Sequence, residues 1–96
     1  MTELKSIQQI LTRLKPELTQ RFFVSSIGLF GSIVRDDFSP HSDVDIVVDF
    51  SKPVGIEFID LADYIETKLK KKVDLVSRKG VTPKYFQQIE SEIIYV

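Results

Sequence analysis

The sequence predicts an α/β (α+β) fold, a small mixed β-sheet flanked by helices. Stretches with apolar residues at three- and four-residue steps indicate amphipathic helices, stretches with period-two alternation indicate strands, and the two kinds follow one another along the chain. The 96 residues, 43% of them hydrophobic and 28% charged, are enough for one core. We therefore expect a single domain over residues 1–96.

The first half of the chain is predicted to form two helices and two strands. Apolar residues recur on one helical stripe through residues 4–18, but Pro16 lacks a backbone N–H and disfavours helix in the residue before it. One helix is therefore expected to end near Leu14 and a second to begin near Pro16. Residues 24–30 form a short apolar run typical of a strand. After a polar segment, the alternation over residues 44–50 predicts a second strand.

The second half continues with a helix, a strand and another helix. Residues 57–69 place apolar side chains on one helical face and acidic ones opposite, which predicts a helix. Lysines at its end and exit suit a solvated carboxyl-terminal cap, and they would equally suit contact with a phosphate or a partner. Residues 73–76 are expected to form a third strand. Thr82 and Pro83 have the residue types of an N-cap and first helical position, and residues 93–96 are candidates for a terminal strand.

Composition excludes several classes of function. The 13 Lys and Arg against 14 Asp and Glu give a net charge of −1, which disfavours broad capture of nucleic acid or of an anionic membrane. The absence of Cys excludes disulfides, thiolate metal sites and cysteine nucleophiles. No apolar run reaches transmembrane length, and no secretory signal pattern is present. We expect a cytoplasmic protein that binds neither membranes nor nucleic acid directly.

Asp43 and Asp45 are the first candidates for chemistry. They lie two residues apart on a predicted strand, so both carboxylates leave the same face. Two like charges about 4 Å apart repel by roughly 4 kcal/mol at an effective dielectric of 20, so such a pair should share a proton or bind a cation. An oxygen-only site suits Mg²⁺ with phosphate as co-ligand. Taken alone, Asp-x-Asp is also typical of a solvated strand end.

Two further features lie upstream and downstream of this pair. Gly31 and Ser32 directly follow the first predicted strand, where a missing Cβ lets the backbone approach a ligand, and hydroxyl and N–H groups can hold phosphate oxygens. The same two residues are compatible with a simple helix start. Asp74 lies inside an apolar strand, where a carboxylate is costly unless paired or bound to metal. Three carboxylates would converge if the two strands are neighbours.

Together these residues resemble a known family. Residues 31–45 read Gly-Ser-x-x-Arg-x-Asp-x-x-x-x-Ser-Asp-x-Asp, and this spacing, with a later Asp on a neighbouring strand, is similar to the polymerase β-type nucleotidyltransferase superfamily. Within it, the short chain resembles the minimal nucleotidyltransferase (MNT) antitoxins of HEPN/MNT toxin–antitoxin pairs. The resemblance implies a nucleotidyltransferase-like fold and a protein adenylyltransferase, which transfers AMP from ATP to a tyrosine hydroxyl of a partner HEPN ribonuclease toxin.

The resemblance also implies residue roles. Gly31 and Ser32 would grip the β- and γ-phosphates of ATP. Asp43 and Asp45 would hold two Mg²⁺ ions, and Asp74 would complete one metal site and help deprotonate the acceptor hydroxyl. Outside that set, Arg35 matches the family arginine, as a phosphate contact or as a brace for the loop. Asp36 stands where the family usually has Gly.

The sequence is compatible with two other functions. One is a non-catalytic antitoxin that neutralises its partner by binding alone, and the other is a stand-alone nucleotidyltransferase for a small hydroxylated compound. Because so short a chain lacks a second wall to hold a small acceptor, the acceptor is expected to arrive on a protein partner, the HEPN toxin, or in a groove shared by two copies. A homodimer or a hetero-oligomer with the toxin would serve. Tyr64, Tyr85 and Tyr95 are either self-modification sites or ordinary packing residues.

Overall fold

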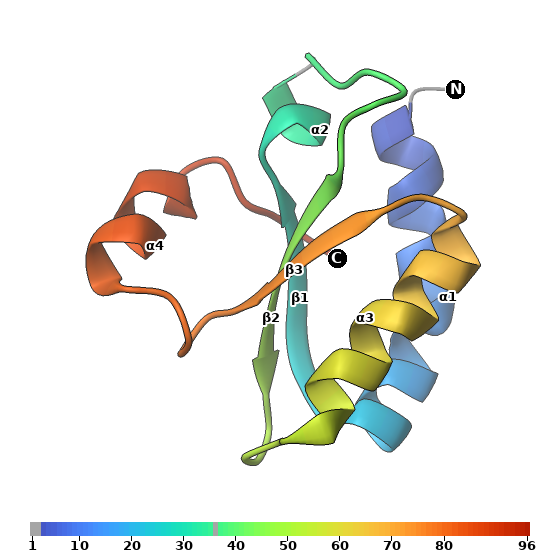
Figure 1. Ribbon diagram of the computed structural model, residues 1–96, viewed down its shortest axis with the longest axis vertical. Coiled ribbons are helices and arrows are strands. Elements are labelled where there is room, and N and C mark those ends of the chain that lie inside the picture. Colours follow the sequence, from blue (N-terminus) through green and yellow to red (C-terminus); the bar gives the residue numbers. More distant parts are fainter. Residues whose placement is uncertain (1–2, 36) are drawn as a thin grey trace.

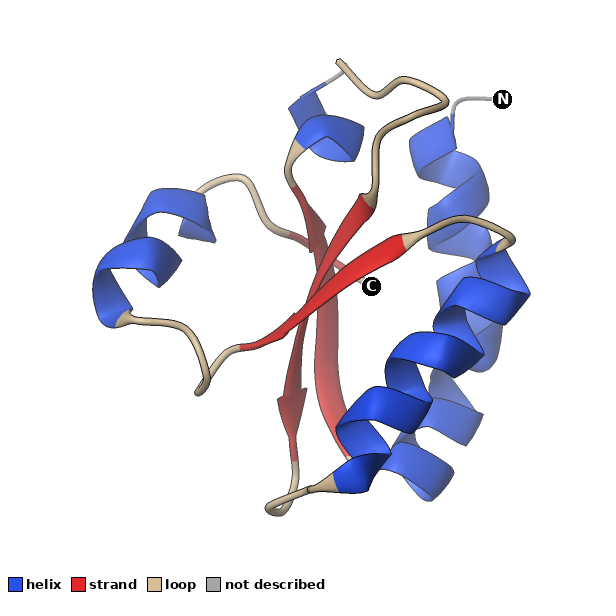
Figure 2. Ribbon diagram, in the orientation of Figure 1, coloured by secondary structure: helices blue, strands red, loops and turns tan. Residues whose placement is uncertain are grey.

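Helices and strands alternate along the chain: one continuous helix replaces the predicted first pair, and a short helix over residues 32–35 follows the first strand. The computed structural model describes residues 3–35 and 37–96, so Asp36 lies outside the described residues. The elements, in chain order, are α1 (Glu3–Phe22), β1 (Val24–Phe30), α2 (Ser32–Arg35), β2 (Val44–Phe50), α3 (Ile56–Leu69), β3 (Val73–Ser77), α4 (Pro83–Glu90) and β4 (Ile94–Tyr95). The predicted fold class, a small mixed sheet flanked by helices, is confirmed (Figure 2).

The four strands form one sheet in the order β3-β2-β1-β4. β1 pairs antiparallel with both β2 and β4, whereas β2 and β3 are parallel and are joined through α3. A parallel pair needs such a crossover connection, because the chain must return to the end at which the first strand began. The residue pairing places Asp45 opposite Phe30 on one side and opposite Asp74 on the other.

The two faces of the sheet are covered by different helices. α1 and α3 lie side by side over one face, and α4 lies over the other (Figure 1). Alternate strand residues divide accordingly: Leu29, Ile46 and Val48 belong to the larger core under α1 and α3, while Phe30 and Val47 pack with Ile89 of α4. This period of two is the alternation read from the sequence of β2. It assigns the acidic positions of β2 to the α4 face.

The predicted break at Pro16 is wrong. α1 is one continuous helix that contains Pro16 in its interior. The buried residues Leu11 and Leu18 lie on either side of the proline, and both are fully buried against the sheet and α3. A kink between them would pull one half of the stripe out of the core, so tertiary packing outweighs the local cost of the proline.

The remaining elements agree closely with the sequence. The predicted helix over residues 57–69 is α3, and Thr82 caps α4 by accepting a hydrogen bond from the backbone N–H of Tyr85 at 3.1 Å. The terminal strand β4 is short, and the Val96 N–H extends its contact with β1 by donating to the Ile27 carbonyl. None of the described helices is long and apolar enough to span a membrane.

Candidate active site

Asp45 and Asp74 meet on the α4 face of the sheet. They are direct neighbours in the parallel pairing of β2 with β3. Their strand neighbours Val44, Ile46 and Leu75 pack into the core on the other face, so both carboxylates are directed to the side that α4 covers. Asp45 is half-buried and Asp74 is exposed. The sheet therefore joins two of the three acidic residues that the sequence singled out.

The environment of Asp45 favours its protonated form. Partial burial is the largest cause, and the nearby Asp74 and Asp43 carboxylates add to it, which together raise the pKa of Asp45 from 3.8 to about 6. Arg35 acts in the opposite direction, but less strongly than these three causes. A carboxyl group surrounded by other carboxylates resists ionisation unless a cation is present. The cluster thus has the electrostatics expected of a cation-binding site.

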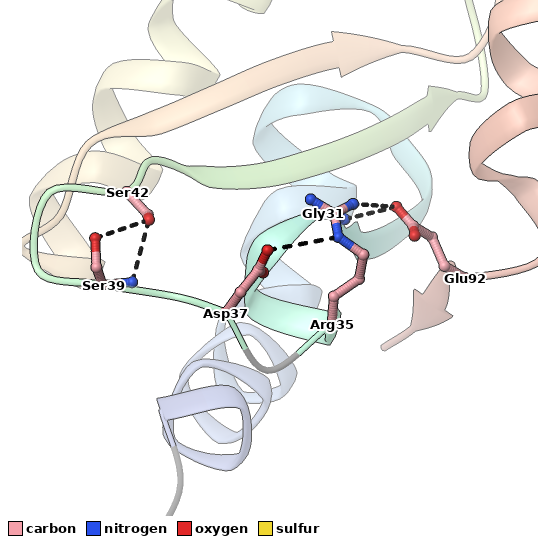
Figure 3. A network of polar contacts seen from close by, with 6 residues as sticks. All are labelled: Gly31, Arg35, Asp37, Ser39, Ser42 and Glu92. Atoms are coloured by element: carbon pink, nitrogen blue, oxygen red, sulfur yellow. Dashed lines mark hydrogen bonds and ion pairs between the residues drawn. The ribbon is translucent and has the colours of Figure 1, made fainter.

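Asp43 lies at the end of a structured loop that leads into β2. Ser39 and Ser42 close this loop. The Ser39 N–H donates to the Ser42 hydroxyl at 3.1 Å (Figure 3), and the Ser42 N–H donates to the Ser39 carbonyl at 3.0 Å. The Val44 N–H then donates to the Lys72 carbonyl and joins the loop to the entry of β3. Asp43 is exposed, so its carboxylate is free to move toward a ligand.

Gly31 forms a tight turn directly against Asp45. Its φ of +78° lies in the left-handed region that glycine adopts without strain. A Cβ at this position would lie within 2.9 Å of Asp45 Cγ, closer than real side chains approach. The Gly31 carbonyl accepts hydrogen bonds from the N–H groups of Val34 and Arg35, which starts α2 with Ser32 as its first residue. The Gly-Ser pair and the acidic residues are therefore in contact through Gly31 and Asp45.

Glu92 is a component of the site that the sequence analysis missed. Its carboxylate oxygen Oε1 accepts a hydrogen bond from the Gly31 N–H at 2.9 Å and another from Arg35 Nη1 at 3.3 Å (Figure 3). Arg35 Nε lies 3.9 Å from Asp37, and its guanidinium is largely exposed. Gly31 and Glu92 are 61 residues apart, so no local pattern links them. The one sequence signal is a carboxylate directly before the apolar residues 93–94.

Tyr85 of α4 faces the same acidic residues. Its pKa is raised above 10.0, with burial as the largest cause, followed by the charges of Asp45, Asp74 and Glu92. The side chain is nevertheless 38% exposed. Tyr64 differs, because its hydroxyl donates to Glu17 and links α3 to α1 away from the site. Of the three tyrosines, Tyr85 is thus the one whose phenol lies in the field of the acidic residues on both β2 and β3.

Two hollows border β2 at its opposite ends. One of about 380 Å³ adjoins Asp43 and is lined by His41 and three consecutive lysines, residues 70–72. The other, of about 440 Å³, lies between Phe50 and Phe58 at the far end of the strand. The acidic residues, the Gly31 turn and the basic hollow therefore share one end of the sheet.

Comparison with known protein families agrees with this geometry. Residues 8–96 match the family model of the nucleotidyltransferase domain. The chain belongs to the nucleotidyltransferase domain family. The resemblance inferred from residues 31–45 is thereby confirmed, and the protein is a nucleotidyltransferase.

Individual relatives show which nucleotidyltransferases the chain is similar to. The nucleotidyltransferase is 42% identical over 97 residues to protein adenylyltransferase MntA of Thermococcus cleftensis, covering 100% of this chain and 98% of the relative. A solved structure provisionally assigned as a minimal nucleotidyltransferase superposes with a TM-score of 0.76 at 26% identity, over 98% of this chain and 95% of that one. A chain from the complex of a tri-AMPylated Shewanella oneidensis HEPN toxin with MNT antitoxin superposes with a TM-score of 0.70 at 22% identity, over 96% and 70% of the two chains, and shares the fold.

The acidic cluster of this nucleotidyltransferase, Asp43, Asp45 and Asp74, has the donor chemistry of a Mg²⁺ site. All its donors are carboxylate oxygens, which hard divalent cations prefer. After burial, the largest cause, the charges of Asp74 and Asp43 raise the pKa of Asp45, and a bound cation would offset these charges. Within residues 3–35 and 37–96, however, no group of three or more acidic or histidine side chains already has metal-holding geometry. Asp45 and Asp74 are adjacent in the sheet, whereas Asp43 is exposed and lies one residue before β2 begins.

Proposed function

We propose that this nucleotidyltransferase is a Mg²⁺-dependent antitoxin that transfers AMP from ATP to a tyrosine hydroxyl of a partner HEPN ribonuclease toxin. One observation carries the proposal: the acidic cluster lies against the Gly31 turn in a chain 42% identical to a protein adenylyltransferase. The cluster supplies the charge that two-metal phosphoryl transfer requires, and the turn supplies backbone donors for phosphate.

In this proposal each part of the site has one task. Gly31 and Ser32 hold the β- and γ-phosphates, while Asp43, Asp45 and Asp74 would hold the two Mg²⁺ ions. When bound, Mg²⁺ neutralises charge on the triphosphate and on the leaving pyrophosphate. The acceptor Oη attacks the α-phosphorus, the bond from that phosphorus to the β-phosphate oxygen breaks, and pyrophosphate leaves. The phenolic proton passes to the Asp74 carboxylate, which is exposed and therefore accessible to an incoming hydroxyl.

The hollow beside Asp43 supports a protein-borne acceptor over a small cationic one. Its lining includes the Asp43 carboxylate together with three lysines, so its net charge is positive, which disfavours an aminoglycoside-like amine and suits an acidic segment of a partner protein. Its volume of about 380 Å³ is near the lower end of the range for sites that bury a small ligand. A stand-alone transferase for a small compound therefore has weaker support than a transferase that modifies a partner protein.

The test is intact mass spectrometry of a HEPN toxin partner after incubation with this protein, ATP and Mg²⁺. We expect mass increments of whole AMP units on the toxin, and their loss when EDTA is present or when an acceptor tyrosine of the toxin is changed to Phe. No increment with any nucleotide would refute the transferase. Asp49→Asn is the matched control. Asp49 is also an acid of β2, but it lies four residues beyond Asp45, near the far end of the strand.

The same assay separates catalysis from neutralisation by binding. In the double variant Asp43→Asn with Asp45→Asn, we expect AMP transfer and suppression of the toxin's ribonuclease activity to be lost together. If transfer is lost but suppression persists at equal complex formation, the protein is an antitoxin that acts by binding alone.

A further inference from the structure

Glu92 joins two donors of the candidate nucleotide-binding turn through a single oxygen. Oε1 accepts from the Gly31 backbone N–H at 2.9 Å and from Arg35 Nη1 at 3.3 Å. The Glu92 side chain is only 23% exposed, whereas that of Arg35 is 53% exposed. A carboxylate acceptor makes both hydrogen bonds charge-assisted, and these are stronger than neutral ones. The contact is therefore a built link between the carboxyl-terminal segment and the turn.

The sheet explains why Glu92 reaches this position. β4 pairs with β1 through Leu29 opposite Ile94, and β4 begins at Ile94. Beyond this pair β1 ends at Phe30, and Gly31 follows directly with no strand residue of β4 opposite it. The Glu92 side chain meets the Gly31 N–H there, where the ladder ends, and the Glu92 N–H is itself fixed by the Ile89 carbonyl at 3.0 Å. Glu92 thus extends the β1–β4 edge by one side-chain hydrogen bond.

We propose that Glu92 is a positioning residue for the nucleotide, an inference that rests on the proposed function. It fixes the Gly31 peptide and the Arg35 guanidinium in one arrangement before ATP binds. Glycine has the widest backbone freedom, so an unrestrained Gly31 would have to be ordered at the expense of binding. Because Gly31 also touches Asp45, the same hydrogen bond sets the turn relative to the acidic cluster.

Three variants test this role. Glu92→Ala removes the acceptor, and Glu92→Gln keeps an oxygen that both donors can reach. Glu90→Ala is the control, because Glu90 is an exposed acid two residues away at the end of α4. We expect Glu92→Ala to raise the KM for ATP roughly tenfold, the order expected for losing a hydrogen bond to a charged group, with kcat changed less. Glu92→Gln should restore most of the affinity, and Glu90→Ala should match the wild type.

An NMR readout tests the contact without turnover. The Gly31 amide proton should move upfield and exchange faster with solvent in Glu92→Ala, and Glu92→Gln should retain most of its protection. A lowered KM for ATP in Glu92→Ala would overturn the proposal and make Glu92 an internal competitor of phosphate. A lowered melting temperature with an unchanged KM and unchanged Gly31 exchange would also overturn it, because Glu92 would then only stabilise the fold.

The experiments distinguish failure of the proposed function from failure of the positioning role of Glu92. If the wild type binds ATP but modifies no toxin, transfer is refuted, while ATP titrations of the three variants followed by NMR still decide the role of Glu92. If the wild type modifies its toxin and Glu92→Ala does so with unchanged KM, the function stands and the positioning role falls. If the wild type binds no ATP, both are refuted.

Discussion

Gly31 and Asp45 are packed so closely that the Asp45 carboxylate occupies the space in which a Cβ on residue 31 would lie. A Cβ on residue 31 would lie 2.9 Å from Asp45 Cγ and 3.2 Å from its Cβ, and the φ of +78° would be strained for any side chain. The turn that is expected to hold phosphate and the strand that carries the acids therefore share one contact. A change at either residue displaces the other.

This contact predicts a severe effect for Gly31→Ala. The methyl group must push the Asp45 carboxylate aside and must adopt a left-handed backbone, which costs about 1–3 kcal/mol of unfolding free energy. Urea denaturation measures this loss, and titration with ATP should show weakened nucleotide binding. Gly55→Ala is the matched control, because a Cβ there meets nothing within 4 Å and the backbone has no positive φ. Equal losses in the two variants would contradict the assigned packing.

The raised pKa of Asp45 predicts a pH dependence of stability. Because its folded-state pKa of about 6 exceeds the ordinary 3.8, the folded protein binds more protons than the unfolded chain between these values. Without metal, Asp45 therefore destabilises the fold progressively as pH rises from about 4 to 6, and its penalty is constant above that window. Asp45→Asn should remove the penalty and stabilise the metal-free protein near pH 7, with no gain below pH 4.

The measurement is the difference in unfolding free energy between Asp45→Asn and the wild type across pH 3.5–8 in EDTA. A difference is needed because Glu17 and Glu57 have lowered pKa values and contribute the opposite slope at more acidic pH. Asp63→Asn, an exposed acid on α3, serves as the control. If the difference in unfolding free energy between Asp45→Asn and the wild type does not change from about pH 4 to 6, the pKa of Asp45 is not raised in the folded protein.

Tyr85 offers a probe of the same acidic residues from α4. Its pKa is raised first by burial and then by Asp45, Asp74 and Glu92, so removing a negative charge should lower it. We expect Asp74→Asn to move the Tyr85 pKa down toward 10.0, measured by NMR of ring-labelled tyrosine. Asp63→Asn again serves as the control. If Asp74→Asn leaves the Tyr85 titration unchanged, α4 does not face the cluster in solution.

Much of the fold could be predicted because the local patterns are strong. The alternation in β2 and the apolar stripe of α3 each set an element's type and its buried face. The same alternation predicts that Asp43 and Asp45 share one side of the sheet, without reference to any tertiary contact. Asp74 is predictable because a carboxylate within an apolar strand is costly unless it is paired or bound to a cation, and its pairing with Asp45 follows from the parallel register.

The parts that escaped prediction depend on contacts between distant residues. Glu92 contacts Gly31 across 61 residues, and this contact depends on where β4 begins beside β1. Tyr85 reaches the acidic cluster only because α4 folds over the face opposite α1 and α3. No periodicity in the chain encodes these encounters. They arise from where α4 packs on the sheet and where β4 pairs with β1.

The continuity of α1 through Pro16 leads to a further prediction. Pro16 removes the hydrogen bond to the Thr12 carbonyl and crowds that carbonyl, yet Leu11 and Leu18 keep the helix continuous. Pro16 is exposed, so replacing it leaves the core intact. Pro16→Ala should raise the unfolding free energy by about 1–3 kcal/mol, the restored helical bond outweighing the added freedom of the unfolded chain. Urea denaturation measures the gain. Lys15→Ala, at an exposed neighbouring position, should change little, and a destabilised Pro16→Ala would mean that the proline shapes α1 to fit the sheet.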